Sequence, residues 1–146
     1  FYLFTRRNLR FPLFDAFDRP DANASCGIRN VSTTAPQSLT LLNSEFSLQS
    51  ARYMAGEILG SGTANYEEWV SQCYERVFSR PPTNLEHETG LAFLQGQVEL
   101  LKNEQRDPAG LATPLGLTTE ADPYKGSALT DYCLAMFNLN EMIYLD

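Results

Sequence analysis

An all-α fold is predicted for this 146-residue chain by two features of its sequence. Apolar residues recur at the three-to-four-residue interval of a helix, and no segment alternates apolar and polar residues as a half-buried strand does. Glycine or proline follows several of the periodic segments, where helices commonly end. We therefore expect a compact bundle of about five helices. Residues 1–146 form one domain in this interpretation, with a loop-rich arm (1–35) and a helical body (36–146).

Two helices are expected at the start of the body. Thr34 is a favourable N-cap, and Pro36 fits the first helical turn, where a missing N–H costs nothing. The apolar face of this helix consists of Leu39, Leu41 and Leu42. A longer helix, capped at Asn43 or Ser44, is expected to end at Gly60. Its inward residues are predicted to be Phe46, Leu48, Ala51, Met54, Ala55, Ile58 and Leu59.

The third and fourth helices are separated by a Pro-Pro dipeptide. The third is expected to begin near Asn65 and to end before Pro81. Its predicted buried residues are Trp69, Val70, Cys73, Val77 and Phe78. Thr83 and Glu86 have the spacing of a capping box and should open the fourth helix, which runs to about Glu104. Its apolar stripe is Leu91, Phe93, Leu94, Val98 and Leu101.

One long loop is expected before the last helix. Residues 106–126 are rich in proline, glycine and threonine and show no sustained period. Loops of this length in a compact domain are uncommon, and they tend to be functional or to wrap a partner. The last helix is predicted to begin at Ser127. Its inward residues are predicted to be Leu129, Tyr132, Cys133, Met136 and Phe137.

The charge of the chain is unevenly distributed. The net charge of the whole chain is −7. Residues 1–35 contain five arginines and three aspartates, which gives a net charge of +2. Residues 36–146 contain six basic and fifteen acidic side chains, which gives a net charge of −9. Nucleic-acid binding normally requires a basic face, so no nucleic-acid partner is expected. No apolar run approaches the roughly 20 residues that span a bilayer, so no membrane span is expected either.

The basic residues of the arm are the first candidate for a binding site. Arg6, Arg7 and Arg10 are close enough in sequence to hold an anionic group or a partner, because each guanidinium offers a planar fork of donors. The alternative is internal ion pairing with the acidic remainder of the chain.

The acidic residues of the arm are a second candidate. Asp15, Asp18 and Asp21, with Asn23 and Ser25 nearby, supply oxygen atoms of the type that Ca²⁺ binds. Their spacing differs from that of an EF-hand loop. The alternative is that these residues end a helical turn and form side-chain turns, without a metal.

Cysteine and histidine give little support for metal or nucleophile chemistry. Cys26, Cys73 and Cys133 form no CxxC or CxxCH motif, so neither a zinc site nor haem attachment is expected in this chain. Cys73 and Cys133 lie in apolar helical patterns and are expected to be buried thiols, with a disulfide bond as the alternative. His87 is the only histidine and supplies at most one ligand. We therefore assign no catalytic, cofactor-binding or metal-binding residue beyond the two candidates in the arm.

Several segments together resemble one protein family. They are RR (6–7) with FDAFDRPD (14–21), TTAPQSL (33–39) with LLNSEF (41–46), SRPPTNLE (79–86), and LTDYC (129–133) with NEMIYLD (140–146). In order and spacing they resemble the C-terminal part of a domain of unknown function. That domain is found in large exported proteins of planctomycetes and related bacteria, which often also carry a cytochrome-c-type haem domain.

This resemblance implies a location and a context. It implies an extracytoplasmic protein, in the periplasm or at the cell surface, whose domain extends upstream of Phe1. The sequence also opens without Met on apolar residues, so we expect the chain to be the C-terminal part of a longer polypeptide. Haem c is implied elsewhere in that polypeptide and not in this chain. The family supplies no established catalytic residues to transfer.

Two functions remain open from the sequence. The first is a non-catalytic helical interaction or structural domain that closes a larger exported protein and packs on its upstream domains or on other subunits. The alternative is part of an enzyme acting on an extracellular glycan, including an anionic one, with an active site mainly upstream that borrows Arg6, Arg7, Asp15 or Asp18. In either case the aromatic arm should be held against a surface, either of this chain or of the upstream region, because exposed phenylalanines are costly.

Overall fold

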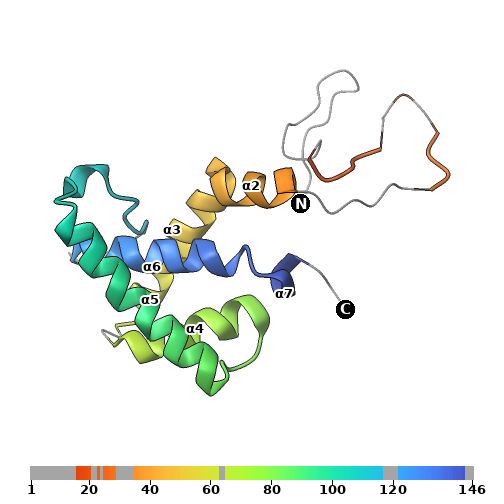
Figure 1. Ribbon diagram of the computed structural model, residues 1–146. Helices are drawn as coiled ribbons and strands as arrows, with labels where there is room; N and C mark the ends of the chain where they lie inside the picture. The colour runs from red at the N-terminus through yellow and green to blue at the C-terminus, as the bar shows by residue number, and fades with distance from the viewer. Residues whose placement is uncertain are drawn as a thin grey trace. The chain divides into compact units, whose positions relative to one another are not determined.

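The fold is described from a computed structural model that covers residues 16–20, 23, 25–28, 35–62, 65–116 and 122–143. Within these ranges every regular element is a helix, which confirms the all-α prediction (Figure 1). The chain divides into two compact units, Phe1–Ser44 and Glu45–Asp146. The elements are α2 (Ala35–Asn43) in the first unit, and α3 (Glu45–Gly60), α4 (Tyr66–Phe78), α5 (Asn84–Asn103), the 3-10 helix η1 (Pro108–Gly110), α6 (Pro123–Met136) and α7 (Asn140–Ile143) in the second.

Helix α2 is the regular element of the first unit. It covers the segment for which a helix is predicted, and Leu39 and Leu42 on its apolar side are exposed. Thr34, the predicted N-cap, lies outside the described residues.

Helix α6 is at the centre of the second unit and contacts α3, α4 and α5 (Figure 1). Most of its circumference is buried, as expected for a helix that is surrounded by others. Asp122 caps it by accepting hydrogen bonds from the backbone N–H groups of Tyr124 and Lys125, and Pro123 occupies the first turn. The predicted start at Ser127 is therefore wrong by four residues, because the Asp-Pro cap extends the helix into the Pro- and Gly-rich segment.

Helix α3 packs on α6 through small and branched side chains. Ala51, Ala55 and Ile58 are fully buried, as predicted from their spacing. Phe46 is 69% exposed, so its predicted inward position is wrong. It is the second residue of α3, one turn or more ahead of the fully buried Ala51, Ala55 and Ile58.

The loop before α6 is anchored to α3. The N–H of Leu115 donates to the carbonyl oxygen of Arg52 at 3.0 Å, and the Arg52 Nε donates to the carbonyl oxygen of Thr113 at 2.7 Å. Gly56 allows this close approach, because a Cβ at that position would lie 1.8 Å from the Leu115 carbonyl oxygen. The described part of the long loop is thus fixed by packing and hydrogen bonds.

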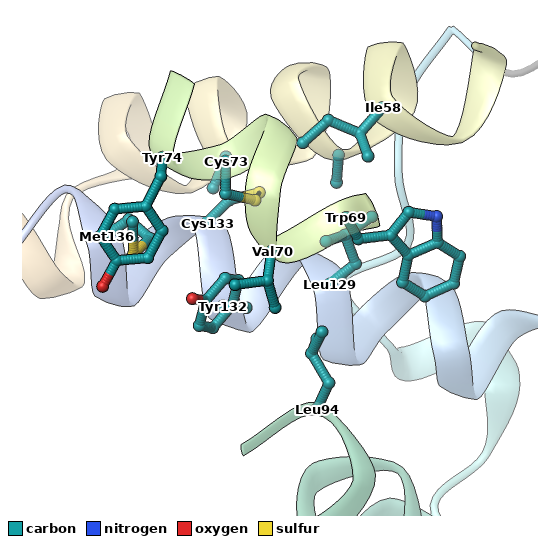
Figure 2. Close-up of a cluster of buried hydrophobic side chains, with 12 residues drawn as sticks. Ile58, Trp69, Val70, Cys73, Tyr74, Leu94, Leu129, Tyr132, Cys133 and Met136 are labelled. Carbon is teal, nitrogen blue, oxygen red and sulfur yellow. Dashed lines mark hydrogen bonds between the residues drawn. The ribbon is translucent and has the colours of Figure 1, made fainter. Parts of the chain in front are cut away.

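Helices α4 and α5 begin and end at the signals seen in the sequence. The Asn65 side chain caps α4, and Thr83 and Glu86 make both hydrogen bonds of a capping box at the start of α5. Residues from α4, α5 and α6 meet with Ile58 of α3 in one core cluster (Figure 2). Its members on these three helices are Trp69, Val70, Cys73, Tyr74, Leu94, Leu129, Tyr132, Cys133 and Met136. None of the helices described is long and apolar enough to cross a membrane.

Candidate functional site

An arginine between two glutamates joins three parts of the second unit. Arg80 follows Ser79, which ends α4 in the left-handed conformation with φ of 57°. Its Nη1 and Nη2 donate to the two carboxylate oxygens of Glu86 at 3.0 and 2.8 Å. Its Nε and Nη2 donate to the two carboxylate oxygens of Glu141 at 2.8 and 2.7 Å. The turn between α4 and α5 is thereby connected to α7, and we call Arg80, Glu86 and Glu141 the Arg80 cluster.

The charges in the Arg80 cluster stabilise one another. Hydrogen bonds from Arg80, and then from the backbone of Thr83, lower the pKa of Glu86 to about 2. The same guanidinium lowers the pKa of Glu141. The two carboxylates in turn raise the pKa of Arg80 above its ordinary value. All three groups are ionised near neutral pH.

The donors of Arg80 are fully used within the protein. A guanidinium has five N–H donors. Four of them bind Glu86 and Glu141, and the fifth, on Nη1, donates to the carbonyl oxygen of Pro81 at 3.1 Å. An external anion would have to displace a carboxylate to bind here. The arrangement therefore suits a structural connection better than anion binding.

An apolar groove lies next to the Arg80 cluster, between α5 and α6. Its volume is about 290 Å³. Leu85 at its edge is 74% exposed, Phe93 is 37% exposed and Leu139 is 42% exposed. Its lining residues are Tyr74, Leu85, Glu86, Thr89, Gly90, Phe93, Tyr132, Ala135, Met136 and Leu139. We call this feature the α5–α6 groove.

The floor of the α5–α6 groove depends on a glycine. A Cβ on Gly90 would lie 2.6 Å from the Tyr132 hydroxyl oxygen and 2.9 and 3.0 Å from the two γ-methyl groups of Val70. The absence of a side chain therefore lets α5 approach α4 and α6 closely. Burial raises the pKa of Tyr132, so its hydroxyl is neutral at ordinary pH. The ring of Phe93 packs against that of Tyr132, with 5.6 Å between the two ring centroids. The groove thus has a neutral, largely apolar floor.

A partly buried carboxylate lies between α5 and α6. The Gln97 Nε2 donates to the Asp131 Oδ2 at 2.8 Å. Burial raises the pKa of Asp131, although the hydrogen bond from Gln97 opposes this shift. The pair contributes a polar connection between the two helices.

Most of the predicted candidate residues lie where the structure gives no description. The predicted anion and calcium residues outside the described ranges are Arg6, Arg7, Arg10, Asp15 and Asp21. Asp18 is described; it is partly buried and has φ of 52°. Among the described residues, no group of three or more His, Cys, Asp or Glu side chains is placed to hold a metal ion. The anion and calcium sites therefore stay predictions.

The histidine and the cysteines of the chain are each found in a position that fits a structural role. His87 is partly buried in the first part of α5. Its backbone N–H donates to the Thr83 carbonyl oxygen at 2.9 Å. Cys73 and Cys133 are buried, as predicted, and Cys26 is exposed.

Sequence reasoning missed both the Arg80 cluster and the α5–α6 groove. Arg80 and Glu141 are 61 residues apart, so no local pattern connects them. The groove was not anticipated because Phe93 was placed on the apolar stripe of its helix, whereas 37% of this residue is exposed. The small Gly90, between the apolar residues Leu85 and Phe93, is the signal that could have indicated a hollow there.

Comparison with known proteins gives one family. No curated protein and no solved structure matches the chain. The model of a family described as "PSD1: Protein of unknown function (DUF1553)" matches residues 1–94. The match includes α2, α3, α4 and the start of α5, with the turn that carries Arg80. Since it covers more than half of the 146 residues, the chain belongs to the PSD1 (DUF1553) family of proteins of unknown function.

Proposed function

We propose that this chain is a non-catalytic interaction domain of a larger exported protein, and that its α5–α6 groove binds a basic, apolar segment from another region of that protein. The observation that carries this proposal is the groove itself. Its lining is mainly apolar, and Leu85, Phe93 and Leu139 expose hydrocarbon around it. Contiguous apolar surface of this kind often marks an interaction site.

Charge favours a basic occupant. Residues 45–146 carry six basic and fifteen acidic side chains. Arg80, the cation next to the groove, already has all its donors bound within the protein. A segment with Lys or Arg beside its apolar side chains would thus meet a surface of complementary potential.

The resemblance described above supports the cellular context of the proposal. It favours a planctomycete-type exported protein, located in the periplasm or at the cell surface, of which this chain is the C-terminal part. In such a protein haem c would be attached to a companion domain. The occupant of the α5–α6 groove would come from the region upstream of Phe1.

A labelling experiment tests the proposal. Thr89 lines the groove and is exposed, and Gly96 is exposed on the same helix with open space around it. Thr89→Cys and Gly96→Cys are each introduced into a Cys26→Ser background. Maleimide labelling rates are then compared between the isolated chain and the full-length protein with its upstream region.

The proposal predicts a different outcome at the two positions. In the full-length protein, Thr89→Cys should react at least about tenfold more slowly than in the isolated chain, because a bound segment excludes the reagent, as at the centre of other interfaces. Gly96→Cys should react at similar rates in both. Equal rates for Thr89→Cys would refute the proposal. Protection that requires an added sulfated oligosaccharide would instead favour the glycan-enzyme alternative.

A further inference from the structure

Two buried thiols from distant parts of the chain lie in contact in the core of the second unit. Cys73 on α4 and Cys133 on α6 are fully buried, and their Sγ atoms are 3.9 Å apart (Figure 2). They are 60 residues apart in the sequence. Both belong to the core cluster in which α4 packs on α6. Both are free thiols in this structure.

The arrangement is close to what a disulfide bond requires. A disulfide needs an S–S distance of about 2.05 Å between cysteines on facing backbone segments. The two Sγ atoms are already neighbours at 3.9 Å, so bond formation requires them to approach by about 1.9 Å. No other residue has to leave the space between them, since the sulfur atoms are in direct contact.

We propose that Cys73 and Cys133 form an intramolecular disulfide bond, which links α4 to α6, when the chain folds in the presence of a disulfide oxidant. The thiolate of one cysteine attacks the oxidant, an organic disulfide RSSR, and gives a mixed disulfide and one RS⁻. The second cysteine loses its proton, attacks the sulfur of the mixed disulfide that belongs to the first, and expels the second RS⁻. The two cysteines are oxidised by two electrons, RSSR is reduced, and both protons end on the released RSH.

The bond should form before the core closes. In the folded chain both sulfur atoms are shielded from a dissolved oxidant. Hydrogen bonding to Cys73 and burial raise the pKa of Cys133, so little of the reactive thiolate is present there. Cys26 is exposed and belongs to the other unit of the chain, so it remains available to reagents in the folded protein.

Refolding with and without an oxidant tests the proposal. The whole chain, as wild type and as Cys26→Ser, is unfolded in urea with a reductant and then refolded with oxidised glutathione or with reductant alone. Free thiols are blocked with N-ethylmaleimide after denaturation, and peptides are analysed by non-reducing mass spectrometry. Cys26→Ser/Cys133→Ala is the control that retains only Cys73.

The expected product is a monomer in which the peptides containing Cys73 and Cys133 are joined. The urea midpoint of this product should shift upward, and the shift should disappear on reduction. Refolded protein with native helical circular dichroism and two blocked thiols at Cys73 and Cys133 would overturn the proposal. Pairing of either cysteine with Cys26 in the wild type, or only mixed disulfides with glutathione, would also overturn it. Because the main readout uses the unaltered core, a folding defect of the control variant does not affect the test.

Discussion

A pair of glycine substitutions on α5 measures how tightly the floor of the α5–α6 groove is packed. Gly90 and Gly96 are both inside the helix, so alanine should raise intrinsic helix stability at each by about 0.8 kcal/mol. At Gly96 no heavy atom beyond the adjacent residues and the local helix backbone lies within 4 Å of the added Cβ, so this gain should be retained in full. At Gly90 the added Cβ meets Tyr132 and Val70 at 2.6 to 3.0 Å.

The packing cost at Gly90 should exceed the gain in helix propensity. Val70 is β-branched and fully buried, so it has little freedom to move, and Tyr132 is confined between α5 and the core. Overpacking of a closed core costs about 1–3 kcal/mol. Gly90→Ala should therefore lower the free energy of unfolding by up to about 2 kcal/mol, while Gly96→Ala raises it by about 0.8 kcal/mol.

Urea unfolding followed by circular dichroism is the assay. With a slope of about 2 kcal/mol per molar urea, typical of a protein of this size, the midpoints of the two variants should differ by about 0.5–1.5 M. Tyr132→Phe in the Gly90→Ala background removes the closest contact but leaves Val70 in place, so it should restore only part of the loss. Equal midpoints for Gly90→Ala and Gly96→Ala would show that the close approach of α5 is not rigid, and the reasoning would fail.

Three further predictions concern the loop, the ion pairs and the thiols. Gly56→Ala should lower the free energy of unfolding by about 3 kcal/mol in the same assay, because the added Cβ would lie 1.8 Å from the carbonyl oxygen of Leu115 in the loop before α6. An unchanged free energy of unfolding would show that this loop is not anchored to α3. The pKa of Glu86 falls from 4.5 in its unperturbed state to about 2 in the fold, so its contribution to stability is complete above about pH 4.5 and is lost as the pH falls towards 2. Arg80→Gln should reduce the decrease of the urea midpoint between pH 4.5 and 2. Arg76→Gln, which removes an exposed ion pair, should leave that decrease unchanged. The same dependence of the urea midpoint on pH in both variants would contradict this reasoning. In the reduced, folded chain, a thiol reagent should modify Cys26 rapidly, and Cys73 and Cys133 only after unfolding. Rapid reaction of all three cysteines would contradict the burial of Cys73 and Cys133.

The sequence predicted those parts of the fold that depend on neighbouring residues. The capping box of Thr83 and Glu86 and the start of a helix near Asn65 depend on a few neighbouring residues, and both predictions are confirmed. Helical periodicity correctly predicted that Trp69, Val70 and Cys73 of α4 are buried. It missed the buried Tyr74, and the predicted Val77 and Phe78 are only partly buried. The start of α6 was wrong because its Asp-Pro cap lies in a segment whose composition is typical of a loop.

The features that were missed depend on contacts between distant residues. Periodicity placed Phe93 on an apolar stripe, but a stripe does not say which of its members a neighbouring helix covers. Cys73 and Cys133 were each predicted to be buried, yet nothing local indicates that α4 and α6 bring their sulfur atoms together. Arg80 and Glu141 are a similar case, since their pairing follows from how α7 meets the turn between α4 and α5.

The central position of α6 has a consequence for the order in which the chain can fold during synthesis. Of the long helices described, α6 is the last to be synthesised, and it is also the helix on which α3, α4 and α5 pack. The earlier helices therefore leave the ribosome without the surface that buries their apolar faces. Folding that follows chain elongation from the N-terminus cannot complete this unit until residue 136 has emerged. Helices α3, α4 and α5 thus stay without their packing partner until α6 has been synthesised, a state that a chaperone can engage.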